Sequence, residues 1–376
     1  MPHPASTHDR AWLDVDLGAV RHNAALLRAR AGVPLLCMVK ANSYGVGAEA
    51  VCRALGVPFD RGAVHAATEA PWGVGIASLD EAEALRQAGC TGRIVCTTPL
   101  LPNELPRARR LDVRPTLHRA PDITFWGSLG GGPWHLAIDT GMSRAGVRWD
   151  AVSPLRDAVR TVPPEGVLTH FHSADEHPAT RDEQDARFEE ALAVLRDVLP
   201  AAVLEHRDNS AGIASRANRS PGHLARPGIA LYAGLFAAEL GLRQVAHLRA
   251  RIVDMRDVYA GETVSYGATW TAPETRRIAT LAVGYADGYR RHLSNAGQVL
   301  VHGQICPVVG RVTMDMTMID VTGTQAALGD VATLLGRDGS NELTTEMVAG
   351  LAGVSPYELL VGLTLRVPAV HHDVLP

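Results

Sequence analysis

The stretch VKANSYGVG, residues 39–47, carries the side chains whose types and spacing could do the most specific chemistry. It closes an apolar run over residues 33–39, which is typical of a strand buried on both faces. A lysine at the end of such a strand, Lys40, loses solvation, which favours the neutral and nucleophilic amine. Tyr44 follows, and two glycines let the backbone turn tightly against a ligand. An amine able to form a Schiff base, beside a phenol, indicates a phosphorylated carbonyl cofactor. From this stretch alone, a surface lysine at a strand end is the simpler interpretation.

Elements able to position this turn recur along the first 235 residues. Ser78 and Glu81 have the spacing of a capping box, which predicts the start of a helix. Hydrophobic spacing predicts strands over residues 11–17, 75–77, 92–96, 135–138 and 165–171. It also predicts helices that begin at about residue 16, over residues 48–55 and over residues 181–198, and the helix that starts at the capping box ends at residue 88. Polar residues cluster directly after the strands, as expected of a parallel barrel with its site at the strand carboxyl ends.

The hydrophobic period changes near residue 240. Leu248, Ala250 and Ile252 alternate with arginines, and residues 312–318 alternate in the same way, which predicts antiparallel strands with one wetted face. We therefore expect an α/β protein with a barrel domain over residues 1–239 and a mainly antiparallel β domain over 240–376. The first strand is free to pack with the second domain.

Composition narrows the function classes. The chain has 376 residues, 46% hydrophobic and 20% charged, with a formal net charge of -4, so neither nucleic acid nor an acidic membrane is an expected partner. Its five cysteines are odd in number and show no CxxC pair, which favours reduced thiols over disulfides or a zinc site. Without a signal-like start or an apolar run of ~18 residues, we expect a cytoplasmic protein with no membrane span.

A set of motifs in family order resembles alanine racemase. They are VKANSYGVG, AIDTGMSRAG (137–146), THFHSADE (169–176), RDNSA (207–211), RPGIALYAG (226–234), VSYGATW (264–270), LAVGYADGYRR (281–291), GRVTMDM (310–316), SPYELL and RVP. The resemblance implies a fold-type III pyridoxal 5'-phosphate enzyme with an eight-stranded α/β barrel and a C-terminal β domain. It also implies a head-to-tail homodimer with shared active sites and a small amino-acid substrate.

By this resemblance, Lys40 is the Schiff-base lysine and one of two catalytic bases. Racemisation removes the α-proton from one face of a carbanion and returns it to the other, which is simplest with a base on each side. Tyr266 in VSYGATW resembles the second base, which the family takes from the partner subunit. The implied reaction interconverts L- and D-alanine through an external aldimine and an α-carbanion. Taken alone, Tyr266 is an ordinary turn or strand aromatic.

The resemblance also implies which residues bind cofactor and substrate. The cofactor-binding residues would be Lys40, Tyr44, His170, Asn209, Ser210, Arg226, the amides of Gly228 and Ile229, and Tyr357. Arg226 would face the pyridine nitrogen and, because a guanidinium accepts no hydrogen bond, would leave that nitrogen unprotonated. The substrate-binding residues would be Arg144, the amide of Met314, Asp315 and Tyr285, the last beside Arg311 in an access corridor. Without the motifs, Ser210 is a helix cap and the corridor residues are ordinary surface polar groups.

Departures from the family pattern leave the substrate open. Ala137 replaces a lysine that usually holds the following arginine, so Arg144 would be held by chloride or water or be looser. Thr313 replaces a cysteine, and His172 stands where a small residue is commoner. A serine or broad-specificity racemase is therefore the nearest alternative. A decarboxylase of basic amino acids, a cofactor carrier of barrel type and a catalytically degenerate family member are further alternatives, although Tyr266 and the second domain argue against the first two.

Overall fold

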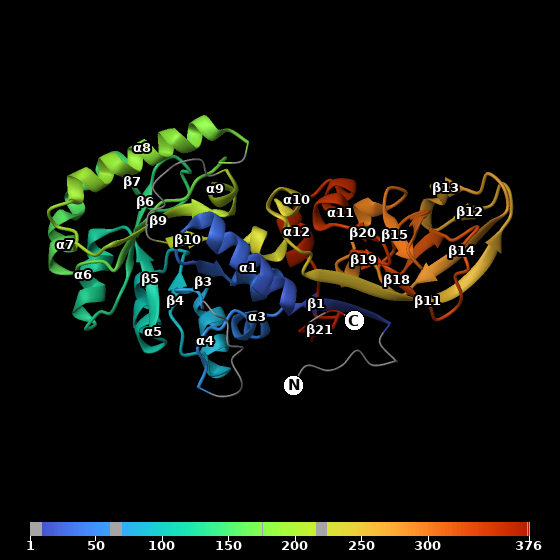
Figure 1. Ribbon diagram of the computed structural model, residues 1–376, viewed down its shortest axis with the longest axis horizontal. Helices are drawn as coiled ribbons and strands as arrows, with labels where there is room; N and C mark the ends of the chain where they lie inside the picture. Colours follow the sequence, from blue (N-terminus) through green and yellow to red (C-terminus); the bar gives the residue numbers. More distant parts are fainter. Residues whose placement is uncertain (1–9, 61–69, 175, 216–223, 374, 376) are drawn as a thin grey trace.

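The structure is a computed structural model that describes residues 10–60, 70–174, 176–215, 224–373 and 375. Within these residues the chain forms two large sheets, one at each end of the molecule, and two small two-stranded sheets (Figure 1). No helix in this part of the chain is long and apolar enough to cross a membrane. All five cysteines, which lie inside these ranges, are buried and free.

The first sheet is a closed parallel barrel in the order β10-β9-β8-β6-β5-β4-β3-β2. Its strands are β2 (Leu36–Met38), β3 (Gly73–Ile76), β4 (Ile94–Cys96), β5 (Val113–Leu117), β6 (His135–Asp139), β8 (Gly166–Leu168), β9 (Leu204–Asn209) and β10 (Leu224–Arg226). The short β7 (Val147–Arg148) pairs with β6. A parallel bridge between Leu35 and Ala225 joins the two ends of the sheet. The predicted barrel is confirmed.

Helices cover the outside of the barrel (Figure 1). They are α1 (Leu17–Ala31), α3 (Ala48–Ala54), α4 (Leu79–Gln87), α5 (Leu105–Arg110), α6 (Ala120–Ser128), α7 (Arg156–Thr161), α8 (Pro178–Leu195) and α9 (Ser210–Ala214). Phe188, Ala191, Leu192 and Leu195 of α8 are all buried, so the amphipathic face read from the sequence is the packed face. The capping box of Ser78 and Glu81 at the start of α4 is also present.

The second sheet is mainly antiparallel and contains the first strand of the chain. Its members are β1 (Ala11–Asp16), β11 (Ala246–Val258), β14 (Arg276–Leu281), β15 (Gln298–Val301), β16 (Gln304–Pro307), β17 (Thr317–Asp320), β18 (Val331–Thr333) and β21 (Ala369–His372). β1 pairs antiparallel with β11 and parallel with β21. Leu248, Ala250 and Ile252 of β11 are buried, which confirms the predicted alternation. We propose a domain boundary near residue 240, between the last parallel strand and β11.

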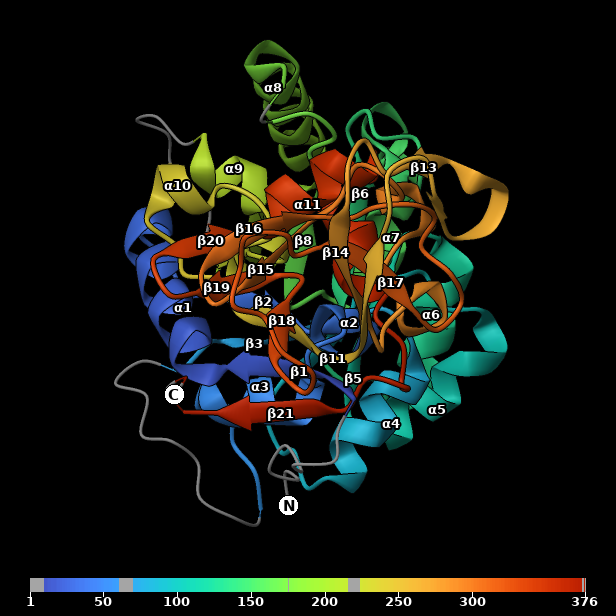
Figure 2. The same ribbon diagram turned by 90° about the vertical axis from the view of Figure 1, so that its right-hand side faces the viewer.

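Smaller elements complete the second domain. They are α11 (Thr345–Ala352), α12 (Pro356–Val361), and the hairpins β12 (Thr263–Val264) with β13 (Trp270–Thr271) and β19 (Gly336–Asp338) with β20 (Asn341–Leu343). The short helix α10 (Ala237–Leu240) lies at the proposed boundary. The β12–β13 hairpin lies at the end of the molecule farthest from the barrel (Figures 1 and 2).

The prediction of a strand over residues 312–318 is wrong for most of its length. Strand β17 begins only at Thr317, and the residues before it form a loop. The amide of Thr313 donates to the carbonyl of Met316 at 2.9 Å, and the Thr313 hydroxyl accepts from the Met316 amide at 3.1 Å. A threonine that satisfies the backbone of a tight turn in this way competes with strand pairing.

Candidate active site

A cavity of about 650 Å³ opens at the carboxyl ends of the barrel strands. Its lining includes these residues that the sequence predicted for the site: Lys40, Tyr44, Arg144, His170, Asn209, Ser210, Arg226, Gly228, Ile229 and Tyr357. All but Tyr357 follow or end a barrel strand, as parallel strands require of a shared edge. Tyr357 comes from α12 of the second domain, so both domains contribute to the cavity.

Lys40 begins a strained turn. The residues from Ala41 to Tyr44 all have left-handed backbone angles, with φ between 52° and 55°. Such a conformation costs ~1–2 kcal/mol per residue without glycine. The carboxylate of Glu81 secures the turn, accepting from the amides of Ala41 at 2.5 Å and Ala77 at 2.7 Å. Strain held by a specific anchor at a strand end is typical of a functional site.

The environment of Lys40 favours its neutral form. Burial lowers the pKa of its ammonium below the ordinary value, and the positive charge of Arg144 lowers it further, while Glu81 opposes both effects. Lys40 is also the only lysine in the chain. Any lysine chemistry of this protein therefore occurs at the mouth of the barrel.

Hydroxyls and backbone amides form a polar cup at one end of the cavity. Ser210 Oγ accepts from the amides of Gly228 at 2.9 Å and Ala230 at 3.3 Å. A side chain on Gly228 would collide with the Tyr44 hydroxyl, so glycine is required for this close approach. The amide of Ile229 donates to no other residue that the structure describes. These donors converge without a lysine or arginine among them.

Asn209 caps α9, which leaves Ser210 to line the cavity. The Asn209 side-chain oxygen accepts from the Gly212 amide at 2.9 Å, and its nitrogen donates to the Phe171 carbonyl at 3.0 Å. The interpretation of Ser210 as the helix cap is therefore wrong, because the residue before it has that role.

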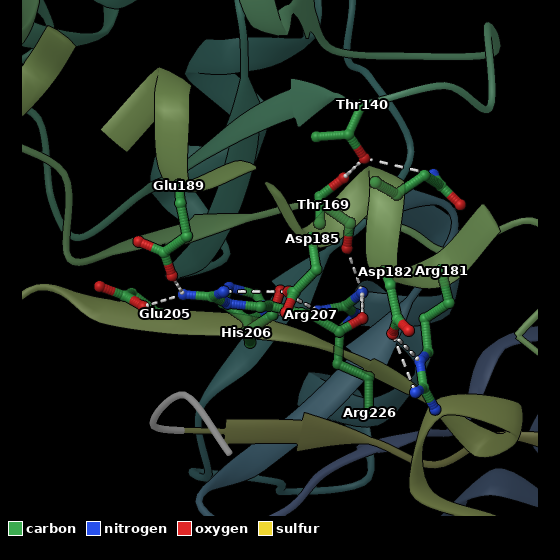
Figure 3. Close-up of polar contacts among 11 residues, drawn as sticks. Thr140, Thr169, Arg181, Asp182, Asp185, Glu189, Glu205, His206, Arg207 and Arg226 are labelled. Atoms are coloured by element: carbon green, nitrogen blue, oxygen red, sulfur yellow. Dashed lines mark hydrogen bonds and ion pairs between the residues drawn. The ribbon is translucent and has the colours of Figure 1, made fainter. Parts of the chain in front are cut away.

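Arg226 is buried and held by several acceptors. Nη1 donates to the carbonyl of His206 and to His206 Nδ1, the latter at 3.1 Å. Nη2 donates to the carbonyls of Thr169 and Arg207. Figure 3 shows Arg226 of β10 beside His206 of β9. The next residue of β9, Arg207, forms ion pairs with three carboxylates, those of Asp185, Glu189 and Glu205. Among the described residues none accepts from Arg226 Nε, which stays available to a ligand.

Burial, assisted by positive charge, keeps His170 neutral. Burial lowers the pKa of His170 to about 3, with smaller contributions from Arg226, Arg144 and Lys40. Burial also lowers the pKa of Arg226 to about 10, which still leaves the guanidinium positive at neutral pH. The cavity is therefore rich in positive charge and suits an anionic ligand.

Ala137 and Arg144 both lie at the cavity, and Arg144 is not fixed by another described side chain there. Ala137 lines the cavity, and Arg144 is exposed there without a hydrogen bond or ion pair to any described residue. Asp139 instead organises the intervening turn, accepting from the amides of Gly141 at 2.9 Å and Ser143 at 3.1 Å.

The remaining predicted site residues lie outside this cavity, in the second domain. Tyr266, between β12 and β13, is 73% exposed as a residue, and Met314 and Tyr285 are 52% and 41% exposed. Asp315 forms an ion pair with Arg366 at 2.8 Å. Ser265 and Ala268 on either side of Tyr266 have positive φ values of 67° and 45°. A second strained turn thus presents a phenol to solvent.

Three residues of the site escaped the sequence analysis: Glu81, His206 and Tyr232. Glu81 was assigned only to a cap, because nothing local in the sequence shows that its carboxylate reaches the Lys40 turn. Tyr232 lies in a named motif, and its hydroxyl donates to the Met38 carbonyl at 2.9 Å at the end of the lysine strand. His206 precedes the RDNSA motif by one residue, and this position was the available signal.

Comparison with known proteins decides the family. The profile of the alanine racemase N-terminal domain matches residues 15–235, and that of the alanine racemase C-terminal domain matches residues 245–371. The chain belongs to the alanine racemase family. The alanine racemase of Deinococcus deserti is 38% identical over 373 residues, covering 96% of this chain and 98% of its own length.

Solved alanine racemases share the fold over nearly the whole chain. The enzyme from Streptomyces coelicolor A3(2) superposes with a TM-score of 0.87 at 30% identity, covering 98% of this chain and 100% of that one. The Bartonella henselae enzyme, solved with covalently bound pyridoxal phosphate, has a TM-score of 0.83 at 25% identity and covers 97% and 100%.

Proposed function

We propose that the protein interconverts L- and D-alanine with pyridoxal 5'-phosphate as its cofactor. Lys40 and Tyr266 of the partner subunit act as the two bases. The observation that carries the proposal is the desolvated Lys40 amine on its strained turn, in a chain of the alanine racemase family. A cytoplasmic location stays a prediction.

The residues of the cavity fit this cofactor. A phosphate matches the cup of Ser210, Tyr44 and the Ile229 amide, since hydroxyls and backbone amides are suitable phosphate donors at the end of a barrel. The free Nε–H of Arg226 matches a ring-nitrogen acceptor, and Lys40 supplies the amine for a carbonyl carbon. Gly228 has no side chain, which keeps the cup open.

When bound, pyridoxal phosphate supplies a carbonyl that condenses with amines and a ring that stabilises negative charge at the substrate α-carbon. Lys40, as a neutral amine, takes or returns the α-proton on one side. The partner's Tyr266 does so on the other. Arg226 stays a pure donor and places no proton on the ring nitrogen, which limits charge withdrawal and side reactions. Arg144 and the Met314 amide bind the substrate carboxylate.

A homodimer with shared sites is part of the proposal. Within one chain Tyr266 does not line the Lys40 cavity. It lies in the turn between β12 and β13, and that hairpin is at the end of the molecule farthest from the barrel (Figure 1). A phenol on a strained, exposed turn is explained if it enters the cavity of a second copy. Tyr285 and Arg311 would then line the access corridor, and the Met314 amide, with Asp315 beside it, would reach the substrate.

A serine or broad-specificity racemase is the second candidate function. Ala137 leaves space in the cavity where the family pattern has a lysine, and Arg144 has no described protein partner to fix it. A mobile carboxylate-binding arginine beside extra space accepts larger side chains more readily than a clamped one.

The test is deuterium incorporation from heavy water into a panel of L- and D-amino acids by the purified protein loaded with pyridoxal phosphate. We expect exchange at Cα of both alanine enantiomers, with accumulation of the opposite one. Faster exchange with serine than with alanine would establish the second candidate. Exchange with none of the panel would refute both.

A further inference from the structure

A line of hydrogen-bonded side chains crosses the barrel interior from Arg226 to the opposite mouth. Arg226 Nη1 lies 3.1 Å from His206 Nδ1, and His206 Nε2 lies 2.7 Å from His135 Nδ1. His135 Nε2 lies 3.3 Å from a carboxylate oxygen of Glu165, which also accepts from Arg114 Nε at 2.6 Å. Arg226, His206 and His135 belong to strands β10, β9 and β6. Arg114, which holds the Glu165 carboxylate, belongs to β5.

The line connects the two ends of the barrel. Arg226 ends β10 at the cavity, and His206 lies within β9. His135 is the first residue of β6, and Glu165 immediately precedes β8. Because the strands are parallel, their amino ends lie at the mouth opposite the cavity.

The line is closely packed. His135 and His206 are fully buried, and the Glu165 side chain is only 26% exposed. The rings of Trp72 and His135 pack edge-to-face, with 5.8 Å between their centroids. A Cβ on Gly166 would lie 2.6 Å from His135 Nδ1, so a glycine at this position lets the imidazole fit.

The two ends of the line fix the direction of every hydrogen bond. A guanidinium only donates, so His206 Nδ1 must accept from Arg226 and Nε2 must carry the proton. That proton is donated to His135 Nδ1, and His135 therefore carries its own proton on Nε2. The carboxylate of Glu165 only accepts, which completes the series. One consistent arrangement of protons follows, with both rings neutral.

Charge supports the neutral state of both rings. Burial lowers the pKa of His206 well below its ordinary value, and Arg226 lowers it further. Burial also lowers the pKa of His135, although Glu165 opposes this effect. Burial alone would raise the pKa of Glu165, but hydrogen bonds from His135 and Arg114 leave it below its ordinary value.

We propose that Glu165 and His135 are positioning residues for the active site. From the amino-terminal end of the barrel strands they fix which nitrogen of His206 is protonated, and His206 in turn fixes how Arg226 is oriented at the cavity. If His206 carried its proton on Nδ1, two donors would face each other and the guanidinium would have to move. The effect on catalysis rests on the proposed function of Arg226, whereas the proton arrangement does not.

The first test measures the proton positions by nitrogen NMR of the histidine rings in the cofactor-loaded protein. His135→Gln and His206→Gln identify the signals. We expect His135 and His206 to be neutral and protonated on Nε2 at and above ~pH 6.5, the ordinary histidine pKa. A charged ring at either position, or a proton on Nδ1 of His206, would overturn the proposal even if the protein proved to be no racemase.

The second test compares Glu165→Ala with Glu165→Gln. Glutamine can still accept from His135 Nε2–H, so we expect it to keep the proton arrangement and racemisation within about twofold. Alanine cannot, and we expect kcat to fall ~10-fold with little change in the KM for the substrate alanine, since a misplacement of about 1 Å can cost up to ~10²-fold. The absorption spectrum of the bound cofactor should change with alanine alone.

The control is His247→Gln, which replaces a buried histidine of the second domain. It should lower the melting temperature without changing kcat or the spectrum. If Glu165→Ala behaves like this control, Glu165 serves stability only and the proposal is wrong. If wild-type protein loaded with cofactor shows no racemisation, the proposed function fails, while the NMR measurement still decides the proton arrangement.

Discussion

The barrel and the second domain present their chemistry in different ways. The barrel gathers its reactive side chains in one cavity, where Lys40 and Arg226 are desolvated and the strand ends hold them. The second domain presents Tyr266, Met314 and Tyr285 on its surface, exposed and outside that cavity. Both regions store backbone strain, at residues 41–44 in the barrel and at residues 265 and 268 beside the phenol.

On the proposed function, this difference means that one chain would hold the cofactor by itself but would supply only one of the two bases to each catalytic site. Burial and Arg144 of the same chain lower the pKa of the Lys40 amine. An exposed phenol on a strained turn lacks an equivalent environment in the chain itself. The account therefore requires a second copy to bring the two together.

The largest expected effect is that of Lys40→Ala, which breaks the barrel half. We expect racemisation to fall at least ~10⁴-fold, because the variant loses both a base and the cofactor's attachment point. Borohydride should fix the cofactor on the wild-type protein at Lys40 alone, which mass spectrometry of its peptides can locate. Lys40→Arg is the control that keeps positive charge without a condensing amine. Undiminished activity of either variant would contradict the assignment.

Tyr266→Phe breaks the other half and should have a one-sided effect. We expect deuterium exchange to fall ~10²–10⁴-fold for one alanine enantiomer and to persist for the other, since Lys40 still serves its own face. Cofactor binding should not change. The measurement is exchange of each enantiomer followed separately, and equal loss for both would argue against two bases.

Gly228→Ala should weaken cofactor binding without touching either base. The new methyl group would collide with Tyr44 in the polar cup, and overpacking of this kind costs ~1–3 kcal/mol, or about 10- to 100-fold in affinity. Titration of the apoprotein with pyridoxal phosphate measures it. Gly132→Ala is the matched control, because a Cβ there has nothing within 4 Å. Equal affinities for the two variants would place the phosphate elsewhere.

The smallest expected effect is a change in the free energy of unfolding at low pH, to which one buried histidine in each region contributes. Burial holds the pKa of His170 in the barrel at about 3 and that of His247 in the second domain at about 4. Unfolded histidines titrate near pH 6.5 and bind protons that the folded protein excludes, so stability is full above ~6.5 and decreases as pH falls toward the folded values. Each contributes at most ~1.4 kcal/mol per pH unit. Urea unfolding of the apoprotein should show a smaller pH slope for His247→Gln than for wild type.

The barrel half was largely predictable from the sequence. Short apolar runs followed by polar residues locate the strand ends, and a parallel barrel brings those ends together, so Lys40, His170 and Arg226 meet in one cavity as expected. The capping box at Ser78 was equally local. What local patterns could not show is a second role for a side chain, as with Glu81, which both caps α4 and holds the Lys40 turn.

The second domain was less predictable for a physical reason. Alternation over residues 312–318 has the period of a strand, but the Thr313 hydroxyl closes a turn instead.

Two features that depend on the assembled molecule also escaped prediction. In the barrel, the members of the line from Arg226 to Glu165 are separated by long stretches of sequence, and only the closed barrel brings them into contact. Motif resemblance named Tyr266, whereas no pattern within one chain determines which cavity it enters.

The most direct test of the shared site mixes two inactive proteins. Lys40→Ala and Tyr266→Phe subunits are combined, dissociated and reassembled with cofactor, and alanine racemisation is measured. In a hybrid dimer one site would contain both Lys40 and the partner's Tyr266, so random assembly should restore roughly a quarter of wild-type activity. Activity no higher than that of the separate variants, in a mixture shown to contain hybrid dimers, would contradict the account.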